Sequence, residues 1–251
     1  ARVALAGEAL IEEPASAEVD KIQTILSSYY QNTDGKIGYV NLFPMYANST
    51  QLGNEPEISP AESVMLYNTD YSDESIDQYK RHVSDYINKI DTDYISVDIY
   101  PYNEDTTDGT AVKSTDDRWL RNLDILAEAC RETDRDLWVI VQAAGNTLED
   151  GNKRHCDEIS DIRQQVYASL AFGAKAIIYG CYQTGWWDDT SHMLDSAGNR
   201  TPTYYAVQSV NSEVRAISEL YGDYSYIGTW YVNPGLCAGH KYDVLVTDTD
   251  E

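Results

Sequence analysis

The sequence predicts an α/β fold, and three observations lead to it. Short apolar segments of strand length alternate with longer segments whose apolar residues recur every three or four positions, which is the period of a helix. The strand-like segments run into polar and aromatic residues, as in NLFPMY, DIYPY and YGCYQTGWW. No glycine-rich phosphate loop follows the first strand, which disfavours the open, dinucleotide-binding type of sheet. The alternation indicates a parallel sheet covered by helices.

The first half of the chain holds three of the predicted strands. The opening strand ends at Pro14, and the helix after it places its apolar residues on one face. A TDGK turn leads to the second strand, which continues into a long polar loop. The next helix has acidic residues in its first turn, where the helix dipole favours them. The predicted elements are strand 8–14, helix 17–30, strand 37–47, helix 72–90 and strand 93–102.

The second half repeats the pattern of helix followed by strand. The last helix opens with Thr201 as a candidate N-cap and Pro202 at the first helical position, which proline tolerates. Amphipathic periodicity and apolar runs define the remaining elements. They are helix 116–132, strand 136–145, helix 158–174, strand 175–185 and helix 201–221.

Long loops after polar strand ends favour a closed TIM (β/α)8 barrel, in which such loops carry the functional site. About five strand and helix pairs are found where a closed barrel needs eight. Residues 1–232 are therefore predicted to form the C-terminal part of a barrel, strands four to eight. Residues 233–251 would be a tail or the start of an appended β segment. A missing N-terminal segment or a second chain would complete the barrel.

Composition and charge exclude several classes of function. The net charge is −24 with only 18 basic residues, so the chain could not neutralise a run of nucleic-acid phosphates. No segment approaches the roughly 20 apolar residues of a membrane span. The four cysteines have no CxxC spacing and no His and Cys cluster appears, so neither a metal nor another cofactor is expected.

The ends of the predicted strands concentrate the side chains that carry chemistry. In a parallel sheet these ends converge on one face. Carboxylates, amides and aromatic rings dominate them, which is the inventory that glycoside hydrolysis needs: two carboxyl groups and aromatic faces against a sugar. The chain also has 21 Tyr and 5 Trp against 2 Phe. The strand-end residues include Glu12, Glu13, Asn41, Asp98, Tyr100, Gln142, Tyr182, Trp186 and Trp187.

A set of ordered segments resembles a known superfamily. GEALIEEPAS is similar to the DEP or NEP signature at the end of strand four in clan A glycoside hydrolases, the superfamily of β-galactosidase-like barrels. The chain also resembles a bacterial group of hydrolases related to that clan, through GYVNLFPMYANSTQLG, DYISVDIYPY, VIVQAAG, IRQQVYASLAFGAKAIIYGCY and TPTYYAVQSVN. The match covers roughly residues 7–215 in order, which makes it more specific than the EEP tripeptide alone.

The resemblance implies roles for particular residues. Glu13, the Glu before Pro, would be the general acid/base, and Glu12 would stand where the clan commonly has Asn. Because successive side chains of a strand point to opposite faces, Glu12 is expected to turn aside. Tyr100 would orient a partner carboxylate or the sugar, and the remaining expected sugar contacts are Asn41, Gln142, Tyr182, Trp186 and Trp187, with one of the two tryptophans as the platform.

The chain departs from the superfamily at strand seven, where the clan keeps its nucleophilic Glu and this sequence has Gln142. An amide cannot form a glycosyl-enzyme ester. Asp98 could serve as the second carboxylate, Gln142 could be an inactivating change, or the protein could bind sugar without cleaving it. The second carboxylate could also be Asp188, Asp189 or a residue of a missing segment.

The functional expectation that follows is a bacterial, secreted or periplasmic glycosidase that acts on a β-linked oligo- or polysaccharide, with Glu13 and Asp98 as its carboxylates. The alternative is a noncatalytic carbohydrate-binding barrel protein. A barrel enzyme of other chemistry, such as a sugar lyase or isomerase, is a third hypothesis, because a fold does not fix a function.

Overall fold

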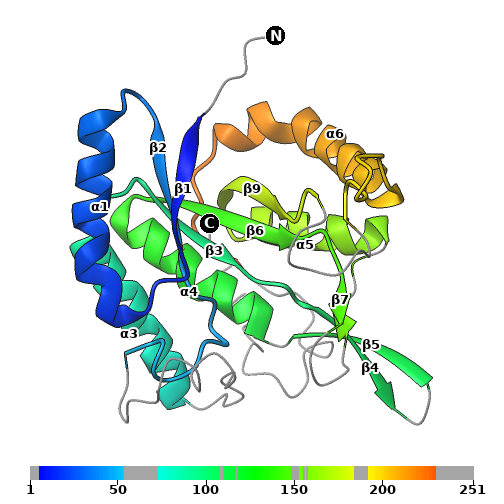
Figure 1. The fold of residues 1–251 in the computed structure, drawn as a ribbon, viewed down its shortest axis with the longest axis horizontal. Coiled ribbons are helices and arrows are strands. Elements are labelled where there is room, and N and C mark those ends of the chain that lie inside the picture. Colours follow the sequence, from blue (N-terminus) through cyan, green and yellow to red (C-terminus); the bar gives the residue numbers. More distant parts are fainter. Residues whose placement is uncertain are drawn as a thin grey trace, which may run out of the picture. The chain divides into compact units, whose positions relative to one another are not determined.

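The computed structural model describes residues 6–53, 73–107, 110–116, 118–147, 153–154, 156, 158–183 and 192–229 (Figure 1). The chain divides into two compact units, Ala1–Asp98 with Ala129–Trp138, and Ile99–Glu128 with Val139–Glu251. The elements alternate between strand and helix and include parallel strand pairing, so the predicted α/β class is confirmed. The predicted tail at 233–251 lies outside the described residues.

The first unit is built on parallel strands. β1 (Gly7–Glu12) pairs in parallel with β2 (Ile37–Asn41), and a parallel bridge links the residue after β2 to β3 (Tyr94–Asp98). The first N–H of β6 (Asp136–Gln142) donates to Asp93 O at 2.8 Å. Because β1, β2 and β3 run in one direction, their last residues lie at the same edge of the sheet.

Two helices cover the strands of the first unit, α1 (Val19–Asn32) and α3 (Asp73–Lys89), which contact each other (Figure 1). A short 3-10 turn, η1 (Ser16–Glu18), precedes α1. A Cβ at Gly38 of β2 would lie 2.9 Å from the side chains of Leu10 and Leu26, so glycine at this position lets α1 approach the strand closely. The buried residues recur at helical spacing and are Val19, Ile22 and Leu26 on α1, and Ile76, Tyr79, Val83 and Tyr86 on α3.

The second unit contains an antiparallel sheet that the sequence analysis missed. β4 (Tyr102–Thr107) and β5 (Thr110–Thr115) pair in the antiparallel direction, and β8 (Lys153–Arg154) and β7 (Asn146–Thr147) extend the sheet. The sequence analysis assigned no helix or strand to residues 103–115. The signal was present, because an Asp-Gly pair at 108–109 between two threonine-rich segments is a strong hairpin pattern.

The helices α4 (Arg118–Thr133), α5 (Ile159–Ala171) and α6 (Pro202–Gly222) follow the predicted order, with β9 (Ala174–Gly180) between the last two. In the second unit α5 packs against α6. The guanidinium of Arg163 donates to both carboxylate oxygens of Glu213 at 2.7 and 3.0 Å, and this pair ties the two helices together.

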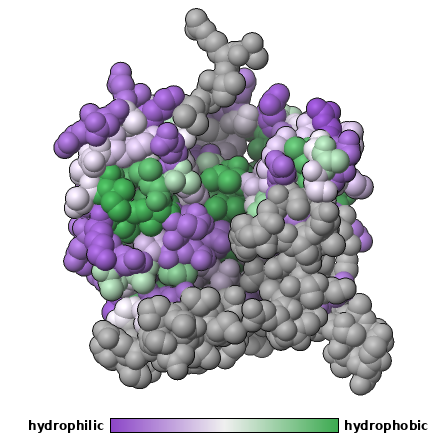
Figure 2. All heavy atoms as spheres, in the orientation of Figure 1, coloured by the Kyte–Doolittle hydropathy of each residue, from purple (hydrophilic) through white to green (hydrophobic). Residues whose placement is uncertain are grey.

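Polar side chains dominate the coloured surface in Figure 2, as the net charge of −24 requires, and hydrophobic side chains gather where α1 and β1 lie. Of the helices in the described part of the chain, none is both long and apolar enough to cross a bilayer.

A buried histidine connects α3 to the segment that follows β1. His82 is fully buried, and its Nδ1 lies 2.7 Å from the Ser16 hydroxyl. The rings of Tyr79 and Phe43 lie against the imidazole, with centroids 6.4 and 6.5 Å away. Burial lowers the pKa of His82 to about 4, although the Asp85 carboxylate acts in the opposite direction. The imidazole is therefore neutral in the folded protein near pH 7.

This depressed pKa predicts a loss of stability in mild acid. The unfolded chain protonates His82 near pH 6.5, whereas the folded chain resists protonation down to about pH 4. The titration of His82 therefore leaves the free energy of unfolding at its full value above about pH 6.5. As the pH falls from 6.5 toward 4, this free energy decreases, and at pH 5 it is lower by about 2 kcal/mol. Urea unfolding at pH 7.5 and 5.0 measures the decline, and it should be smaller in the non-titrating variant His82→Gln. An equal decline in both proteins would contradict the assignment.

Candidate active site

One buried amide joins two carboxylates at the ends of three parallel strands. Asn41, the last residue of β2, donates from Nδ2 to Glu12 Oε1 at 2.9 Å and to Asp98 Oδ1 at 2.6 Å. Glu12 closes β1, and Asp98 closes β3. Asn41 is fully buried and Asp98 is 6% exposed, whereas Glu12 is exposed. All three belong to the first unit. The parallel register of the strands therefore builds this cluster.

The shared amide fixes how far apart the two carboxylates are. The two oxygens that it contacts are separated by at most about 5.5 Å, which is the 2.9 Å and the 2.6 Å placed end to end. Retaining glycosidases hold their two carboxyl groups about 5–5.5 Å apart, and inverting ones about 6.5–9.5 Å. The upper bound of about 5.5 Å for these two oxygens is compatible with the retaining spacing and shorter than the inverting one.

The other end of the amide is held by two hydroxyl groups. Asn41 Oδ1 accepts from the Ser96 hydroxyl at 3.1 Å and from the Tyr39 hydroxyl at 3.4 Å. These two hydroxyl oxygens lie 2.5 Å apart. Because a hydroxyl donor faces Oδ1, the NH₂ group of Asn41 faces the two carboxylates. Sequence reasoning missed Ser96 and Tyr39, which precede Asp98 and Asn41 by two positions and so share their face of the sheet.

An aromatic stack lies beside this network in the first unit. The ring of Tyr94 stacks on Trp138 with centroids 4.1 Å apart and on Tyr39 at 6.0 Å. The Tyr94 hydroxyl accepts from Val40 N at 3.0 Å and donates to Gly38 O at 2.9 Å, so it inserts into the backbone of β2. This use of both ring and hydroxyl explains why tyrosine rather than phenylalanine occupies the position.

The electrostatics of the cluster favour a proton on Glu12. Although Glu12 is exposed as a residue, its carboxyl group meets the buried Asn41 and is partly desolvated, which raises its pKa above the ordinary value, and the nearby Asp98 carboxylate raises it further. The hydrogen bond from Asn41 opposes both effects. A carboxyl group with a raised pKa beside a second carboxylate is the arrangement from which general acids are made.

Glu13 follows the strand in an unusual backbone conformation. Its φ is +44°, a region that non-glycine residues adopt at a cost of about 1 kcal/mol or more, and its N–H donates to Asn41 O at 2.9 Å. β1 ends at Glu12, and Pro14 is buried. The expectation that Glu12 turns aside is wrong, because its carboxylate binds the amide that also binds Asp98. The acid/base role of Glu13 stays a prediction.

Gln142 belongs to a backbone-binding network in the second unit. Its side chain is fully buried, accepts from Tyr102 N at 3.1 Å and donates to Ala144 O at 3.2 Å and Tyr102 O at 3.4 Å. Its own backbone is bound by Gln165, whose amide accepts from Gln142 N at 2.7 Å and donates to Gln142 O at 3.0 Å. These contacts require both a hydrogen-bond donor and an acceptor, and an amide side chain supplies both. The backbone network is therefore a sufficient reason for glutamine at this position, whether or not a nucleophile was replaced.

The other predicted sugar contacts are distributed as follows. Tyr100 is buried in the second unit, and a Cβ at Gly180 would lie 2.8 Å from its hydroxyl. Tyr182, also in the second unit, is 54% exposed. Trp186 and Trp187 lie outside the described residues, as do Asp188 and Asp189. The predicted residues that the structure brings together are therefore Asn41 and Asp98, with Glu12 as the third member.

Two of the cavities can be described from residues that the structure places, and Glu12, Asn41 and Asp98 line neither of these two. One, of about 670 Å³, lies in the first unit at the opposite, N-terminal ends of β2, β3 and β6, beside Trp138. The other, of about 570 Å³, lies in the second unit. Within the described residues, no three His, Cys, Asp or Glu side chains gather as a metal ion would require.

The shared amide makes a prediction about the pKa of Glu12. Removing the Asp98 charge with Asp98→Asn should lower this pKa, because the repulsion that favours the protonated form is lost. Asn41→Ala should raise it, because the donor that stabilises the carboxylate is removed. Carbon-detected NMR titration of the Glu12 carboxyl group measures both shifts. Shifts in the same direction in the two variants would contradict the geometry.

The network of Gln142 makes a second prediction. Gln142→Glu should lower the free energy of unfolding by about 2–4 kcal/mol, because a buried carboxylate cannot donate to the Tyr102 and Ala144 carbonyls and faces them instead. Urea unfolding measures this loss, with Gln31→Glu on the exposed side of α1 as a matched control that should change stability by less than about 0.5 kcal/mol. A stable Gln142→Glu variant that gains hydrolytic activity would show instead that the position is a lost nucleophile.

Comparison with known proteins assigns no family to the chain. No protein-family model and no curated protein sequence matches it. The solved structures that resemble it include a β-galactosidase from the psychrophilic Marinomonas ef1, with 12% identity and a TM-score of 0.47, covering 82% of this chain and 28% of that one.

Two further structures are similar to the chain to a comparable degree. The β-galactosidase of Halorubrum lacusprofundi is 14% identical, with a TM-score of 0.42, over 87% of this chain and 27% of that one. The β-glucosidase of Thermotoga maritima is 12% identical, with a TM-score of 0.40, over 77% and 56%. The chain thus spans about a quarter to a half of the length of these enzymes. At TM-scores below 0.5, the likenesses carry no argument about its fold or its activity.

Proposed function

We propose that this protein is a glycoside hydrolase that uses Glu12 and Asp98 as its carboxylate pair. The observation that carries the proposal is the single amide of Asn41, which binds both carboxylates and keeps them within about 5.5 Å of each other. Two carboxyl groups at this spacing are the core of a retaining glycosidase. The resemblance of the GEALIEEPAS segment to the acid/base signature of clan A supports the same reaction class.

The raised pKa of Glu12 assigns the two roles. Glu12, whose pKa is raised by burial and by Asp98, donates its proton to the glycosidic oxygen as the bond to the leaving sugar breaks. An Asp98 oxygen forms a bond to the anomeric carbon and gives a covalent glycosyl-enzyme. Glu12, now a carboxylate, takes a proton from water, whose oxygen displaces Asp98. The anomeric configuration is retained, and both carboxyl groups return to their starting states.

Asn41 contributes through its position between the two groups. Its NH₂ group stabilises the Asp98 carboxylate before attack, and the Ser96 hydroxyl keeps the amide in this orientation. Retaining catalysis needs a proton on Glu12 and none on Asp98, so hydrolysis should be fastest in mild acid. The alkaline limb of the pH profile would report the pKa of Glu12.

The substrate class and the setting are part of the proposal. A β-linked oligo- or polysaccharide is the substrate that the clan A resemblance implies, together with a barrel whose remaining strands come from a preceding segment or a second chain. A secreted or periplasmic enzyme fits that role. The resemblance also offers Glu13 in place of Glu12 as the acid/base, and mutation separates the two.

Hydrolysis of a panel of aryl β-glycosides tests the proposal. Glu12→Gln and Asp98→Asn should each lower kcat/KM by about 10²–10⁴-fold, because each removes a group that acts in the transition state. Glu8→Gln is the matched control on the same strand: Glu8 is exposed, and its substitution should leave kcat/KM unchanged. Proton NMR of the first product should show retention of the anomeric configuration.

Other outcomes of this experiment have definite meanings. A large loss in Glu13→Gln with little effect of Glu12→Gln would transfer the acid/base role to Glu13. Inversion of configuration would contradict the pair spacing. Sugar binding without cleavage of any substrate would favour the noncatalytic carbohydrate-binding protein.

A further inference from the structure

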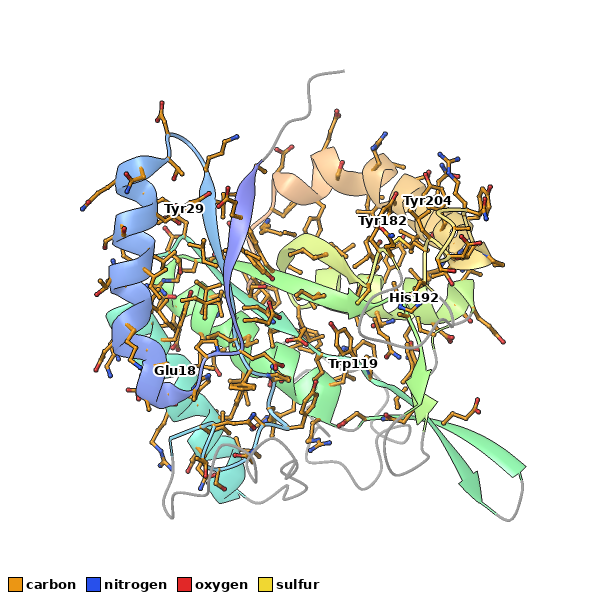
Figure 3. All side chains as sticks on the ribbon, viewed as in Figure 1. Glu18, Tyr29, Trp119, Tyr182, His192 and Tyr204 are labelled. Atoms are coloured by element: carbon orange, nitrogen blue, oxygen red, sulfur yellow. The ribbon has the colours of Figure 1, made fainter. Side chains whose placement is uncertain are left out.

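The cavity of the second unit lies between β9 and α6 and has a lining suited to a ligand. Its volume is about 570 Å³, within the range of about 300–1,000 Å³ found for small-molecule sites. Three tyrosines line it, Tyr179 of β9, Tyr182 just after it and Tyr204 of α6. Figure 3 shows Tyr182 and Tyr204 near each other at the start of α6. The cavity therefore offers several aromatic faces together.

One face of α6 supplies the polar groups of the cavity. Tyr204, Gln208, Asn211 and Arg215 all line it, and their spacing of four, three and four residues places them in one row along the helix. The row presents an aromatic ring, two amides and a guanidinium in sequence. Hydrogen-bonding groups arranged beside tyrosine rings are what a sugar, with its apolar face and hydroxyl rim, requires.

The hydroxyl of Tyr179 orients one of these amides. It donates to Asn211 Oδ1 at 2.7 Å, so the NH₂ group of Asn211 is the end that remains to donate to a ligand. Burial raises the pKa of Tyr179 to about 12, which keeps the hydroxyl protonated and able to donate. The two side chains come from β9 and α6, so the hydrogen bond also links the two walls.

One arginine, Arg215, lines the cavity, and a second, Arg200, lies over the ring of the lining residue Tyr204 at 4.5 Å without belonging to the described lining itself. Neither arginine forms an ion pair with a carboxylate of the described residues. By contrast, Glu213 on the same helix is paired with Arg163. No Asp or Glu occurs among the described lining residues, although the chain has 42 acidic residues against 18 basic ones. A guanidinium beside tyrosine rings and amides, in a described lining that holds no carboxylate, favours an anionic ligand.

We propose that this cavity binds a saccharide unit that carries an anionic group, a carboxylate or a sulfate ester. The tyrosine rings pack against the sugar ring, the amides of Gln208 and Asn211 bind its hydroxyls, and the guanidinium of Arg215 binds the anion, while Arg200 adds positive charge beside Tyr204. Guanidinium groups suit this role because their planar donors match the oxygens of a carboxylate or a sulfate. The site is a binding site, and it stands independently of the hydrolysis proposed for the first unit.

Titration calorimetry of the full chain with two tetrasaccharides tests the inference. The probes are a tetramer of galacturonic acid and a neutral tetramer of galactose, each in 50 mM NaCl. The acidic probe should bind at least about tenfold more tightly than the neutral one, because only it has an anionic group for the guanidinium of Arg215 to bind. Raising NaCl to 500 mM should weaken binding of the acidic probe alone, since the arginines are exposed to salt screening.

Variants identify the cavity as the location of this binding. Arg200→Gln with Arg215→Gln should abolish the preference for the acidic probe, and Tyr182→Ala should weaken the binding of both probes. Arg131→Gln is the matched control: this exposed arginine lies near only its neighbour Glu132, at 4.0 Å, in the residues described, and its loss should change neither affinity. The same titrations in Asp98→Asn should give unchanged affinities, which separates this site from the proposed catalytic pair.

Four results would overturn the inference. Three of them come from titrations of the unaltered protein: equal affinities for the acidic and neutral probes, no binding of the acidic probe up to 10 mM, or full competition by inorganic sulfate at the same concentration as the saccharide. The last result would make the cavity a simple anion site. Retention of the acidic preference in the double arginine variant would also place the binding elsewhere.

Discussion

The candidate site depends on one amide that serves two carboxylates. Two unit charges about 5 Å apart repel each other by about 3 kcal/mol at an effective dielectric constant near 20. Asn41 offsets part of that repulsion by donating one hydrogen bond to each carboxylate. The repulsion that remains raises the pKa of Glu12 and so favours its protonated, neutral form. The parallel register of β1, β2 and β3 makes this possible, because it brings the last residue of each strand to the same edge. A slip of one residue in any strand would turn its member away from the cluster.

The two units use buried amides for different purposes. In the first unit, Ser96 and Tyr39 hold the oxygen of Asn41, so its NH₂ group is available to charged neighbours. In the second unit, both ends of the Gln142 amide are bound to backbone, and the Gln165 amide binds the backbone of Gln142 in turn. The first arrangement binds two titratable groups, whereas the second satisfies backbone groups of Tyr102 and Ala144. Two residues of similar chemistry thus differ in function because of what faces them.

The distribution of charge follows a similar division. Carboxylates crowd the strand ends of the first unit, where they are useful as acids and nucleophiles. In the second unit, Arg163 is matched by Glu213, while Arg200 and Arg215 meet aromatic rings and amides instead of acids. Arg215 shares its cavity with tyrosine rings and amides, and this combination favours a ligand that has an apolar face and a negative charge.

The sequence by itself determined the α/β class, the order of the main strands and helices, and the gathering of Asn41 and Asp98 at strand ends, because periodicity and strand direction are local properties of the chain. It did not predict the β4–β5 hairpin, where an Asp-Gly signal was passed over, or the side on which Glu12 lies. Only the tertiary structure decided that Glu12 shares Asn41 with Asp98, that Ser96 orients the amide, and that Gln142 is bound to backbone. These facts depend on contacts between strands far apart in sequence, and no local pattern specifies them.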